Sequence, residues 1–273
     1  MPKLGLIAGY GELPLAVAEE ARAKGYEVIA VGLEPLADKT LASSVNDMRW
    51  INVGKLGDII GYLKRAGVSE AVMAGKVPKS LLYKSKISPD LRAIKLLFTL
   101  KDKSDDSILL AIAKELKKDG ITLLNTTDFT SNLLTPEGII TAKGPTENEW
   151  NDIAFGWKIA KEIGRLDIGQ TVVIKDQAVM AVEAIEGTDE AIRRGSTLAG
   201  SGAVVIKVSK PQQDMRFDVP VVGPDTLGSM IAVQARVLAV ESQKSILLQK
   251  KKIAREADKA GIVIVGIRDE NTS

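Results

Sequence analysis

The first half of the chain alternates short apolar runs with helix-forming segments, and this pattern restricts the fold more than any other feature. Buried strands are predicted at Lys3–Ala8, Glu27–Val31 and Glu70–Ala74, with a helix over Leu56–Ala66 before the last of them. Short buried strands that are joined through helices run parallel in one sheet. The pattern therefore predicts an α/β fold that begins with a Rossmann-like, doubly wound parallel-sheet domain.

A change of composition marks the end of this first domain. Two helices, Pro89–Leu100 and Asp105–Lys118, and a strand at Ile121–Leu124 are expected before it. Residues 135–146 are rich in Pro, Gly and Thr, a composition typical of a linker. We therefore expect a nucleotide-binding-like domain at 1–134, a linker at 135–146 and a C-terminal α/β catalytic domain at 147–273.

The second domain is predicted to open with a helix at Glu147–Gly164 and a hairpin at Gln170–Ala184 that turns at Lys175-Asp176-Gln177. A short helix begins near Thr188, where the hydroxyl suits an N-cap. The remaining predicted elements are a strand at Ala203–Val208, an extended segment at Asp218–Gly223, a helix at Asp225–Arg236, strands at Val237–Val240 and Ile246–Leu248, a helix at Lys250–Ala260 and a strand at Ile262–Ile267.

Cysteine and histidine are both absent from the 273 residues. This excludes disulfides, thiolate catalysis and the commonest zinc ligands, and it removes the commonest general base. Metal binding and proton transfer must then rely on carboxylates, lysine, tyrosine or hydroxyl groups. Carboxylate and phosphate oxygens favour hard cations, so the expected cofactor is Mg²⁺ or another divalent cation.

Charge and hydropathy narrow the choice of partners. A net charge of +2 and an aromatic content of 4% provide neither the field nor the stacking surface of a nucleic-acid-binding protein. The apolar runs fall short of the ~18–20 residues that cross a bilayer, and a strand rather than a signal peptide follows the N-terminus. We expect a cytoplasmic protein, and we leave open peripheral contact with the inner membrane.

A glycine-containing turn from Gly9 to Pro14 joins the first strand to its helix. Backbone N–H groups at the positive end of a helix suit a phosphate group. The turn lacks the third glycine of the dinucleotide fingerprint, and Glu12 adds a negative charge where a pyrophosphate would lie. We interpret Gly9, Gly11, Glu12 and Leu13 as part of a nucleotide site; a βα turn that binds nothing is the alternative.

Gly75-Lys76-Val77 directly follows a strand, at the sheet edge where ligands bind in open α/β folds. Lys76 and Val77 are expected to contact substrate, with the Lys76 ammonium offsetting phosphate charge. The alternative is a solvated lysine in a loop.

The stretch from Lys76 to Lys103 carries eight basic residues and two acidic ones. Within it, an apolar helix face is predicted, formed by Leu91, Ile94, Leu97 and Phe98. An amphipathic basic helix can bind acyl chains or an anionic membrane surface. An apolar stripe at this spacing, however, more often packs against the hydrophobic core. We adopt the core interpretation for this face.

Two strings in the second half combine cations and carboxylates. The first, Glu186-Gly187-Thr188-Asp189-Glu190, places acids in the first turn of a predicted helix, where the helix dipole alone explains them. The second extends from Lys207 to Pro220 at the end of a strand. Its members of interest are Lys207, Lys210, Gln213, Arg216 and Asp218. Phosphate needs cations and Mg²⁺ needs carboxylates, and this string supplies both; a solvated charged loop is the alternative.

Four strings in this order are specific in combination: GLIAGYGELP at 5–14, AGKV at 74–77, EGTDE at 186–190 and KPQQDMRFDVP at 210–220. Together they resemble the LpxI-type UDP-2,3-diacylglucosamine pyrophosphatases of lipid A synthesis, over essentially the whole chain. The absence of histidine agrees with this resemblance, because the unrelated calcineurin-like enzymes for the same reaction rely on a histidine-rich dimetal centre.

The resemblance implies Mg²⁺-dependent hydrolysis of UDP-2,3-diacylglucosamine to 2,3-diacylglucosamine 1-phosphate and UMP, with water attacking the phosphorus on the UMP side. Asp218, in the Arg-Phe-Asp-x-Pro string, is the expected essential carboxylate, and Asp189 and Glu190 are the second candidates. Asp218 and Asp189 are the expected metal ligands. The residues expected to bind substrate in this half are Thr188, Lys207, Lys210, Gln213 and Arg216. A homodimer is also expected on this resemblance.

Two other classes of function remain open at this point. A nicotinamide-dependent oxidoreductase fits the opening strand–helix–strand pattern, but the missing third glycine, Glu12 and the lack of histidine count against it. No Tyr is followed four residues later by Lys, so the dyad of a short-chain dehydrogenase is also missing. A non-catalytic nucleotide- or lipid-binding module is the second alternative, motivated by the basic segment at Leu91–Lys101.

Overall fold

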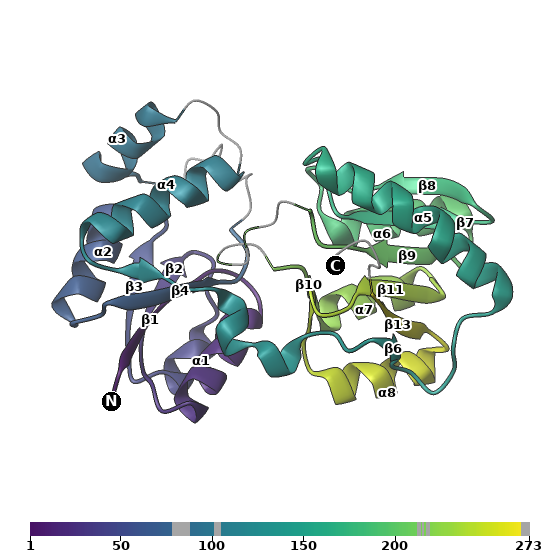
Figure 1. Ribbon diagram of the computed structural model, residues 1–273, viewed down its shortest axis with the longest axis horizontal. Helices are drawn as coiled ribbons and strands as arrows, with labels where there is room; N and C mark the ends of the chain where they lie inside the picture. The colour runs from purple at the N-terminus through teal and green to yellow at the C-terminus, as the bar shows by residue number, and fades with distance from the viewer. Residues whose placement is uncertain (78–87, 101–104, 212–213, 215, 217–218, 269–273) are drawn as a thin grey trace. The chain divides into compact units, whose positions relative to one another are not determined.

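The structure is a computed structural model that describes residues 1–77, 88–100, 105–211, 214, 216 and 219–268 (Figure 1). It divides into two compact units. The first comprises Met1–Ser131 together with Asp214–Asp218, and the second comprises Asn132–Gln213 and Val219–Ser273. Both units combine a sheet with helices, which confirms the predicted α/β class.

The sheet of the first unit has five parallel strands in the order β3-β2-β1-β4-β5. Their bounds are β1 (Lys3–Ala8), β2 (Glu27–Glu34), β3 (Asp47–Asn52), β4 (Glu70–Ala74) and β5 (Thr122–Leu123). The chain leaves β1 toward β2 on one side and later returns to β4 on the other side. Such a reversal of strand order opens a crevice at the carboxyl ends of the two strands, here β1 and β4.

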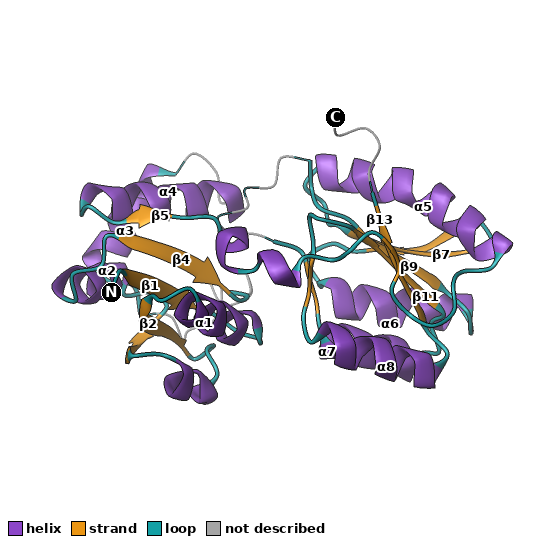
Figure 2. Ribbon diagram, turned by 60° about the horizontal axis from the view of Figure 1, so that its bottom comes forward, coloured by secondary structure: helices purple, strands orange, loops and turns teal. Residues whose placement is uncertain are grey.

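Helices cover both faces of this sheet (Figure 2). The α-helices are α1 (Leu13–Ala23), α2 (Leu56–Arg65), α3 (Leu91–Thr99) and α4 (Asp105–Lys118), and 3₁₀ helices occupy η1 (Lys39–Ser44) and η3 (Thr126–Phe129). Side chains from α2, α3 and α4 share one apolar core with the sheet, centred on residues such as Leu63, Leu96 and Leu116. The other face is covered by α1, whose Val17, Ala18 and Ala21 are fully buried.

The second unit has a mixed six-stranded sheet in the order β6-β13-β11-β9-β7-β8. Its strands are β6 (Gly138–Ile139), β7 (Thr171–Lys175), β8 (Ala178–Val182), β9 (Val204–Lys207), β11 (Val237–Glu241) and β13 (Val263–Ile267), and a separate parallel pair is formed by β10 (Val221–Val222) and β12 (Ile246–Leu247). The central strands β9, β11 and β13 run parallel, and the outer strands are antiparallel to their neighbours.

The helices of the second unit also lie on both faces of their sheet, with α5 on one side and the other three on the opposite side (Figure 2). They are α5 (Glu147–Arg165), α6 (Thr188–Ala199), α7 (Pro224–Ala232) and α8 (Lys250–Ala260), and η4 (Ser131–Leu133) precedes them. The start of α5 is fixed by a capping box between Thr146 and Glu149. None of the described helices combines the length and the apolar character that crossing a membrane requires.

Three segments differ from the sequence-based expectations. The strand β3 was not predicted, and the expected linker at 135–146 contains β6, which pairs with β13 in the second unit. The apolar face assigned to the core in α3 is divided: Ile94 and Leu97 are partly buried, but Leu91 and Phe98 are 77% and 86% exposed. That core assignment was therefore wrong for Leu91 and Phe98.

Candidate functional site

The carboxyl ends of β1 and β4 are joined by backbone hydrogen bonds. The Gly9 N–H donates to the Ala74 carbonyl at 2.8 Å, and Tyr10 and Lys76 exchange two bonds, of 2.9 and 2.8 Å. The glycine turn after β1 and the loop after β4 thus form one continuous surface at the reversal of strand order. The predicted residues of both segments, Gly9, Gly11, Glu12, Leu13, Lys76 and Val77, are brought together there.

Two glycines make this close approach sterically allowed. A Cβ atom on Gly9 would lie 2.7 Å from the Lys76 carbonyl oxygen, and one on Gly75 would lie 2.8 Å from the Tyr10 carbonyl oxygen. Gly75 also has φ +90°, which L side chains rarely adopt. The turn therefore packs closely against the end of β4, mainly through backbone atoms, with the Pro14 ring also near Gly75.

The other side of the turn is open. Gly11 has φ +101°, and a Cβ atom there would meet nothing within 4 Å. Helix α1 begins two residues later, and the Glu12 side chain makes no capping hydrogen bond to it. Glu12, which precedes α1, and Lys76 are exposed, while Leu13 and Pro14 at the helix start are buried. Backbone N–H groups at a helix start suit an anionic group.

Part of the segment after β9 also belongs to this edge of the first unit. The buried Thr126 hydroxyl lies 2.9 Å from the Met73 carbonyl oxygen of β4 and 3.4 Å from the Arg216 carbonyl oxygen. The Arg216 guanidinium binds Asp214 through contacts of 2.9, 3.1 and 2.5 Å, which holds the pKa of Asp214 below its usual value. The predicted residues Gln213 and Asp218 lie outside the described residues.

In the second unit, three buried polar side chains form a chain of hydrogen bonds. The Lys207 ammonium, at the end of β9, donates to the Thr188 hydroxyl at 3.0 Å, and that hydroxyl donates to Glu183 Oε1 at 2.9 Å. Lys207 is only 2% exposed and Glu183 only 7%. The predicted residues Thr188 and Lys207 are therefore neighbours. Glu183 was missed, although its place between an apolar strand and the EGTDE string is a usable signal.

The N-cap assignment of Thr188 was wrong. Helix α6 is preceded by Gly187, whose φ of +87° suits glycine, and Thr188 is the first helical residue. Its hydroxyl is already engaged by Lys207 and Glu183, so it makes no cap.

Asp189 and Glu190 have different surroundings in the first turn of α6. Glu190 is exposed and pairs with Arg193, while Arg193 also reaches the Ser229 hydroxyl at 3.1 Å. The Oδ1 atom of Asp189 is buried and, within the described residues, has no hydrogen-bond partner. Mg²⁺ is commonly held by one or two carboxylates together with substrate phosphates. Asp189 therefore fits as one ligand, although the described part of the chain contains no group of three or more carboxylate side chains that could hold a metal ion.

A second buried carboxylate organises the segment after β9. Glu241 is fully buried. Each of its two carboxylate oxygens accepts a hydrogen bond of 2.9 Å from the Lys161 ammonium, and Oε2 also accepts one of 2.8 Å from the Ser209 N–H. The next residue, Lys210, forms an ion pair of 2.5 Å with Asp167. Sequence reasoning missed Glu241, because a glutamate at the end of an apolar strand looks like a solvated residue.

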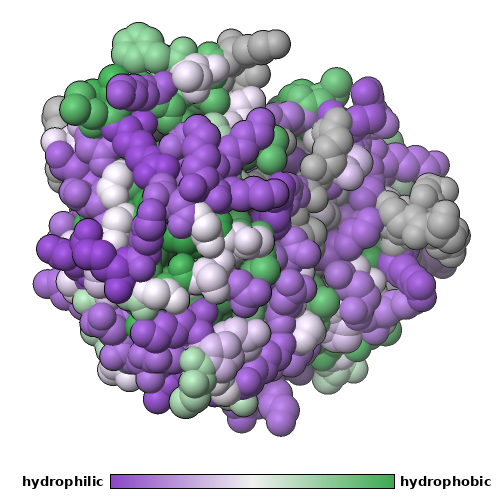
Figure 3. Space-filling model, turned by 60° about the vertical axis from the view of Figure 1, so that its left-hand side comes forward, coloured by the Kyte–Doolittle hydropathy of each residue, from purple (hydrophilic) through white to green (hydrophobic). Residues whose placement is uncertain are grey.

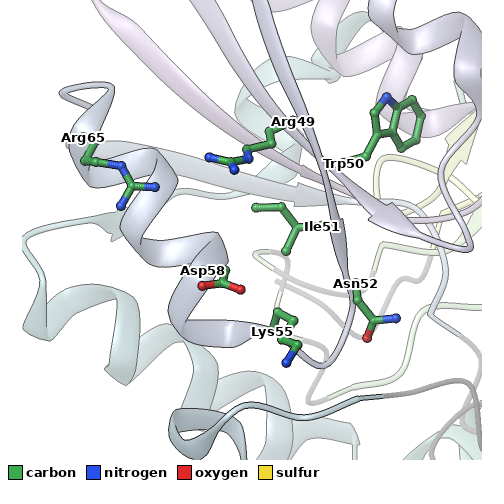
Figure 4. Close-up of a pocket in the computed structure, with 7 residues that line it drawn as sticks. All are labelled: Arg49, Trp50, Ile51, Asn52, Lys55, Asp58 and Arg65. Carbon is green, nitrogen blue, oxygen red and sulfur yellow. The ribbon is translucent and has the colours of Figure 1, made fainter.

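A separate cavity of about 280 Å³ lies in the first unit, between the edge strand β3 and helix α2 (Figure 4). Side chains of Arg49, Lys55, Asp58 and Arg65 point toward the space between these elements, whereas Trp50 and Asn52 point to the other side of the strand. This cavity is not at the glycine turn. Its lining contains none of the residues that the sequence analysis selected.

The fold defines a class: a two-domain α/β protein with a Rossmann-like first domain. The comparison with known families is more specific. Residues 3–133 match the LpxI N-terminal domain and residues 136–265 match the LpxI C-terminal domain, so the chain belongs to the LpxI family.

A curated relative covers nearly the whole chain. UDP-2,3-diacylglucosamine pyrophosphatase LpxI of Caulobacter vibrioides is 31% identical over 278 residues, which is 98% of each protein. Similar solved structures include a UDP-glucose-4-epimerase from Stenotrophomonas maltophila (11% identity, TM-score 0.29, covering 44% of this chain and 34% of that one). Another is a phosphoribosylglycinamide synthetase from Anaerococcus prevotii (15% identity, TM-score 0.26, covering 63% and 32%). The chain spans only about a third of these two structures, and at such TM-scores the likeness carries no argument.

Proposed function

We propose that this protein hydrolyses UDP-2,3-diacylglucosamine to 2,3-diacylglucosamine 1-phosphate and UMP. The observation that carries the proposal is 31% identity, over 98% of both chains, to a curated UDP-2,3-diacylglucosamine pyrophosphatase. The match of both halves of the chain to the LpxI domains supports it. We also propose, on the family resemblance alone, a homodimer that works in the cytoplasm.

In the proposed reaction, a water oxygen bonds to the phosphorus on the UMP side. The bond from that phosphorus to the bridging oxygen breaks, and the bridging oxygen leaves with the sugar-side phosphate. A proton is lost from the attacking water. The new oxygen atom therefore ends up in UMP, and the lipid product keeps all the oxygens of its own phosphate.

The first unit is proposed to hold the nucleotide-sugar head group. Backbone N–H groups at Gly11 to Leu13 would face an anionic phosphate at the open side of the turn, where a Cβ on Gly11 would meet nothing within 4 Å. The exposed Lys76 would offset its charge, with Gly9, Glu12 and Val77 completing the surface. Arg216 is also proposed to bind substrate at this sheet edge, because its carbonyl oxygen lies 3.4 Å from the Thr126 hydroxyl.

The carboxyl-terminal half of the sequence is proposed to supply the catalytic carboxylates. Asp218 and Asp189 would hold a divalent cation, Mg²⁺ in the first instance, and such a cation supplies Lewis-acid polarisation of a phosphoryl oxygen. The buried pair Thr188 and Lys207, bonded to each other at 3.0 Å, would fix the start of α6 and with it the adjacent Asp189. Lys210 and Gln213 would bind phosphate oxygens, and Asp189 and Glu190 are the second candidates for the essential carboxylate.

The test is incubation of the purified protein with UDP-2,3-diacylglucosamine, with Mg²⁺ or with a chelator, followed by mass analysis of the products. We expect UMP and the lipid 1-phosphate in equal amounts with Mg²⁺ and at least about 100-fold less with the chelator. An intact substrate under every divalent cation tried would contradict the proposal.

Variants separate the carboxylates from one another. Asp218→Asn is expected to lower kcat by about 10³-fold and Asp189→Asn by at least about tenfold, since each removes a negatively charged oxygen donor. Asp176→Asn is the matched control: Asp176 lies exposed in the β7–β8 turn with φ +50°, a conformation that Asn tolerates. Activity of Asp218→Asn within a few-fold of wild type, with folding intact, would remove Asp218 from the proposal.

A further inference from the structure

Helix α3 presents an apolar stripe outward, away from the core that it helps to form. Leu91 and Phe98 are 77% and 86% exposed, and Lys95 between them is also exposed. At about 100° of rotation per residue, these three positions fall on one side of the helix. The opposite side contains the buried Leu96, with Ala93, Leu97 and Leu100 packed against the same core.

The orientation of α3 is fixed by polar contacts at its start and at Arg92. Arg92 binds Glu115 at 2.8 Å and Asp119 at 2.7 Å, which attaches α3 to α4 and to the residue that follows it. The Asp90 carboxylate caps α3 by accepting from the Ala93 N–H at 2.8 Å and also accepts from the Gly57 N–H at 2.6 Å. Leu91 and Phe98 therefore face solvent because the helix is held in that orientation.

The stripe carries a positive charge at Lys95, and α4, which is joined to α3 through Arg92, carries further exposed lysines. Its acidic neighbours are engaged: Glu115 also pairs with Lys118, and Asp119 also pairs with Lys64. Lys95 and, on α4, Lys114 and Lys117 are exposed. In sequence, the stretch from Lys76 to Lys103 carries eight basic residues and two acidic ones. Figure 3 shows hydrophobic side chains gathered beside hydrophilic ones at the top of the face that includes α3.

The geometry points to an anionic lipid bilayer as the occupant of the α3 stripe, defined here as Leu91, Lys95 and Phe98. Two large apolar side chains enter the interface between head groups and acyl chains, and Lys95 meets a lipid phosphate. Each basic residue near such a surface adds electrostatic attraction that falls off within a Debye length. The inference rests on the proposed function in one respect: a substrate with two acyl chains resides in such a membrane.

A vesicle flotation assay tests the α3 stripe without using the hydrolytic reaction. Full-length protein is mixed with vesicles of phosphatidylglycerol and phosphatidylethanolamine, or of phosphatidylcholine alone, at low and high salt. Wild type is expected to float with the anionic vesicles, to be released by salt, and to bind phosphatidylcholine at least about tenfold more weakly.

Three variants locate the binding surface. Leu91→Ser/Phe98→Ser and Lys95→Glu are each expected to weaken binding to the anionic vesicles by at least about tenfold, because they remove the apolar anchors or reverse the charge. Leu166→Ser/Leu198→Ser removes two side chains of the second unit that are 57% and 68% exposed, and is expected to leave binding unchanged. Circular dichroism and the melting temperature check that each variant is folded.

Three results would overturn the inference. The first is wild type that fails to float with anionic vesicles, and the second is equal binding by wild type and the α3 variants. The third is a loss of oligomeric mass, by light scattering, in Leu91→Ser/Phe98→Ser, which would make the stripe a contact between copies of the chain. Vesicle binding without hydrolysis would refute only the proposed function, and hydrolysis of detergent-solubilised substrate without vesicle binding would refute only the docking surface.

Discussion

The polar sites of the two units differ in composition: one is formed mainly by backbone groups and the other by buried side chains. In the first unit, the site at the ends of β1 and β4 consists of backbone: an exchange of hydrogen bonds between Tyr10 and Lys76, allowed by Gly9 and Gly75. In the second unit, buried side chains form the framework: Lys207–Thr188–Glu183, and Lys161 with Glu241. A backbone site is damaged by adding atoms, whereas a side-chain network is damaged by removing them.

The largest effect is expected from removing the carboxylate at the centre of the second network. Glu241→Ala takes away the acceptor of both Lys161 and the Ser209 N–H, and the loss of a buried ionic partner costs about 3–5 kcal/mol. Urea unfolding followed through Trp150 and Trp157, in a Trp50→Phe background, reports on this unit, since these are the three tryptophans of the chain. A loss below 1 kcal/mol would show that Glu241 does not organise this network.

The first unit is expected to respond most to an added methyl group. Gly75→Ala places a Cβ 2.8 Å from the Tyr10 carbonyl oxygen and imposes an unfavourable φ of +90°, so we expect a loss of about 2–3 kcal/mol. Unfolding is followed through Trp50 in a Trp150→Phe/Trp157→Phe background. Gly61→Ala, in α2 of the same unit, is the control: its Cβ would meet only the end of the Arg65 side chain, at 3.2 Å, and it is expected to be neutral or stabilising by up to about 1 kcal/mol. Equal behaviour of the two variants would contradict a backbone-built site.

A smaller change in stability is expected when only a hydroxyl group is lost. Thr188→Val keeps the shape of the side chain but breaks the bonds to Lys207 and Glu183, at a cost of about 1–3 kcal/mol. Because Asp189 follows directly, we expect kcat to fall by at least about tenfold, while Thr188→Ser restores most of it. If Thr188→Val and Thr188→Ser have the same kcat, the hydroxyl plays no part in positioning the site.

The smallest effect concerns the surface ion pairs of the first unit. Lys118 and Arg92 hold the pKa of Glu115 below its usual value, and Lys64 and Arg92 do the same for the pKa of Asp119. A carboxyl group whose pKa is lower in the folded state than in the unfolded state stabilises the fold at pH values above its unfolded pKa. This stabilisation is lost as the pH falls through the lower, folded-state pKa. Arg92→Gln should therefore flatten the decline in stability of the first unit between about pH 5 and pH 3. The free energy of unfolding is measured by urea unfolding across this pH range. If its decline toward low pH is the same in Arg92→Gln as in wild type, these contacts are contradicted.

Most of the regular elements could be predicted from the sequence because their signals are local. β1 and β4 are short apolar runs bounded by glycine or polar residues, and their predicted bounds are confirmed, as are those of α4 and α8. β3 was missed because Asp47–Asn52 is an edge strand with only Ile51 buried, so it carries no continuous apolar run.

The networks and the exposed stripe could not be predicted because they depend on packing. Glu183 and Glu241 are acidic residues at strand ends, and only the folded chain shows that each is less than a tenth exposed and bonded to buried partners. In α3 the apolar residues are spread around most of the helix. The sequence therefore could not show which side packs, and the ion pairs of Arg92 select the side that includes Leu96.

The most direct test of the central claim is hydrolysis of UDP-2,3-diacylglucosamine in water enriched in ¹⁸O, with the mass of each product measured. Attack on the UMP-side phosphorus predicts one labelled oxygen in UMP and none in the lipid 1-phosphate. Label in the lipid phosphate, or failure to form the two products at all, would contradict the account.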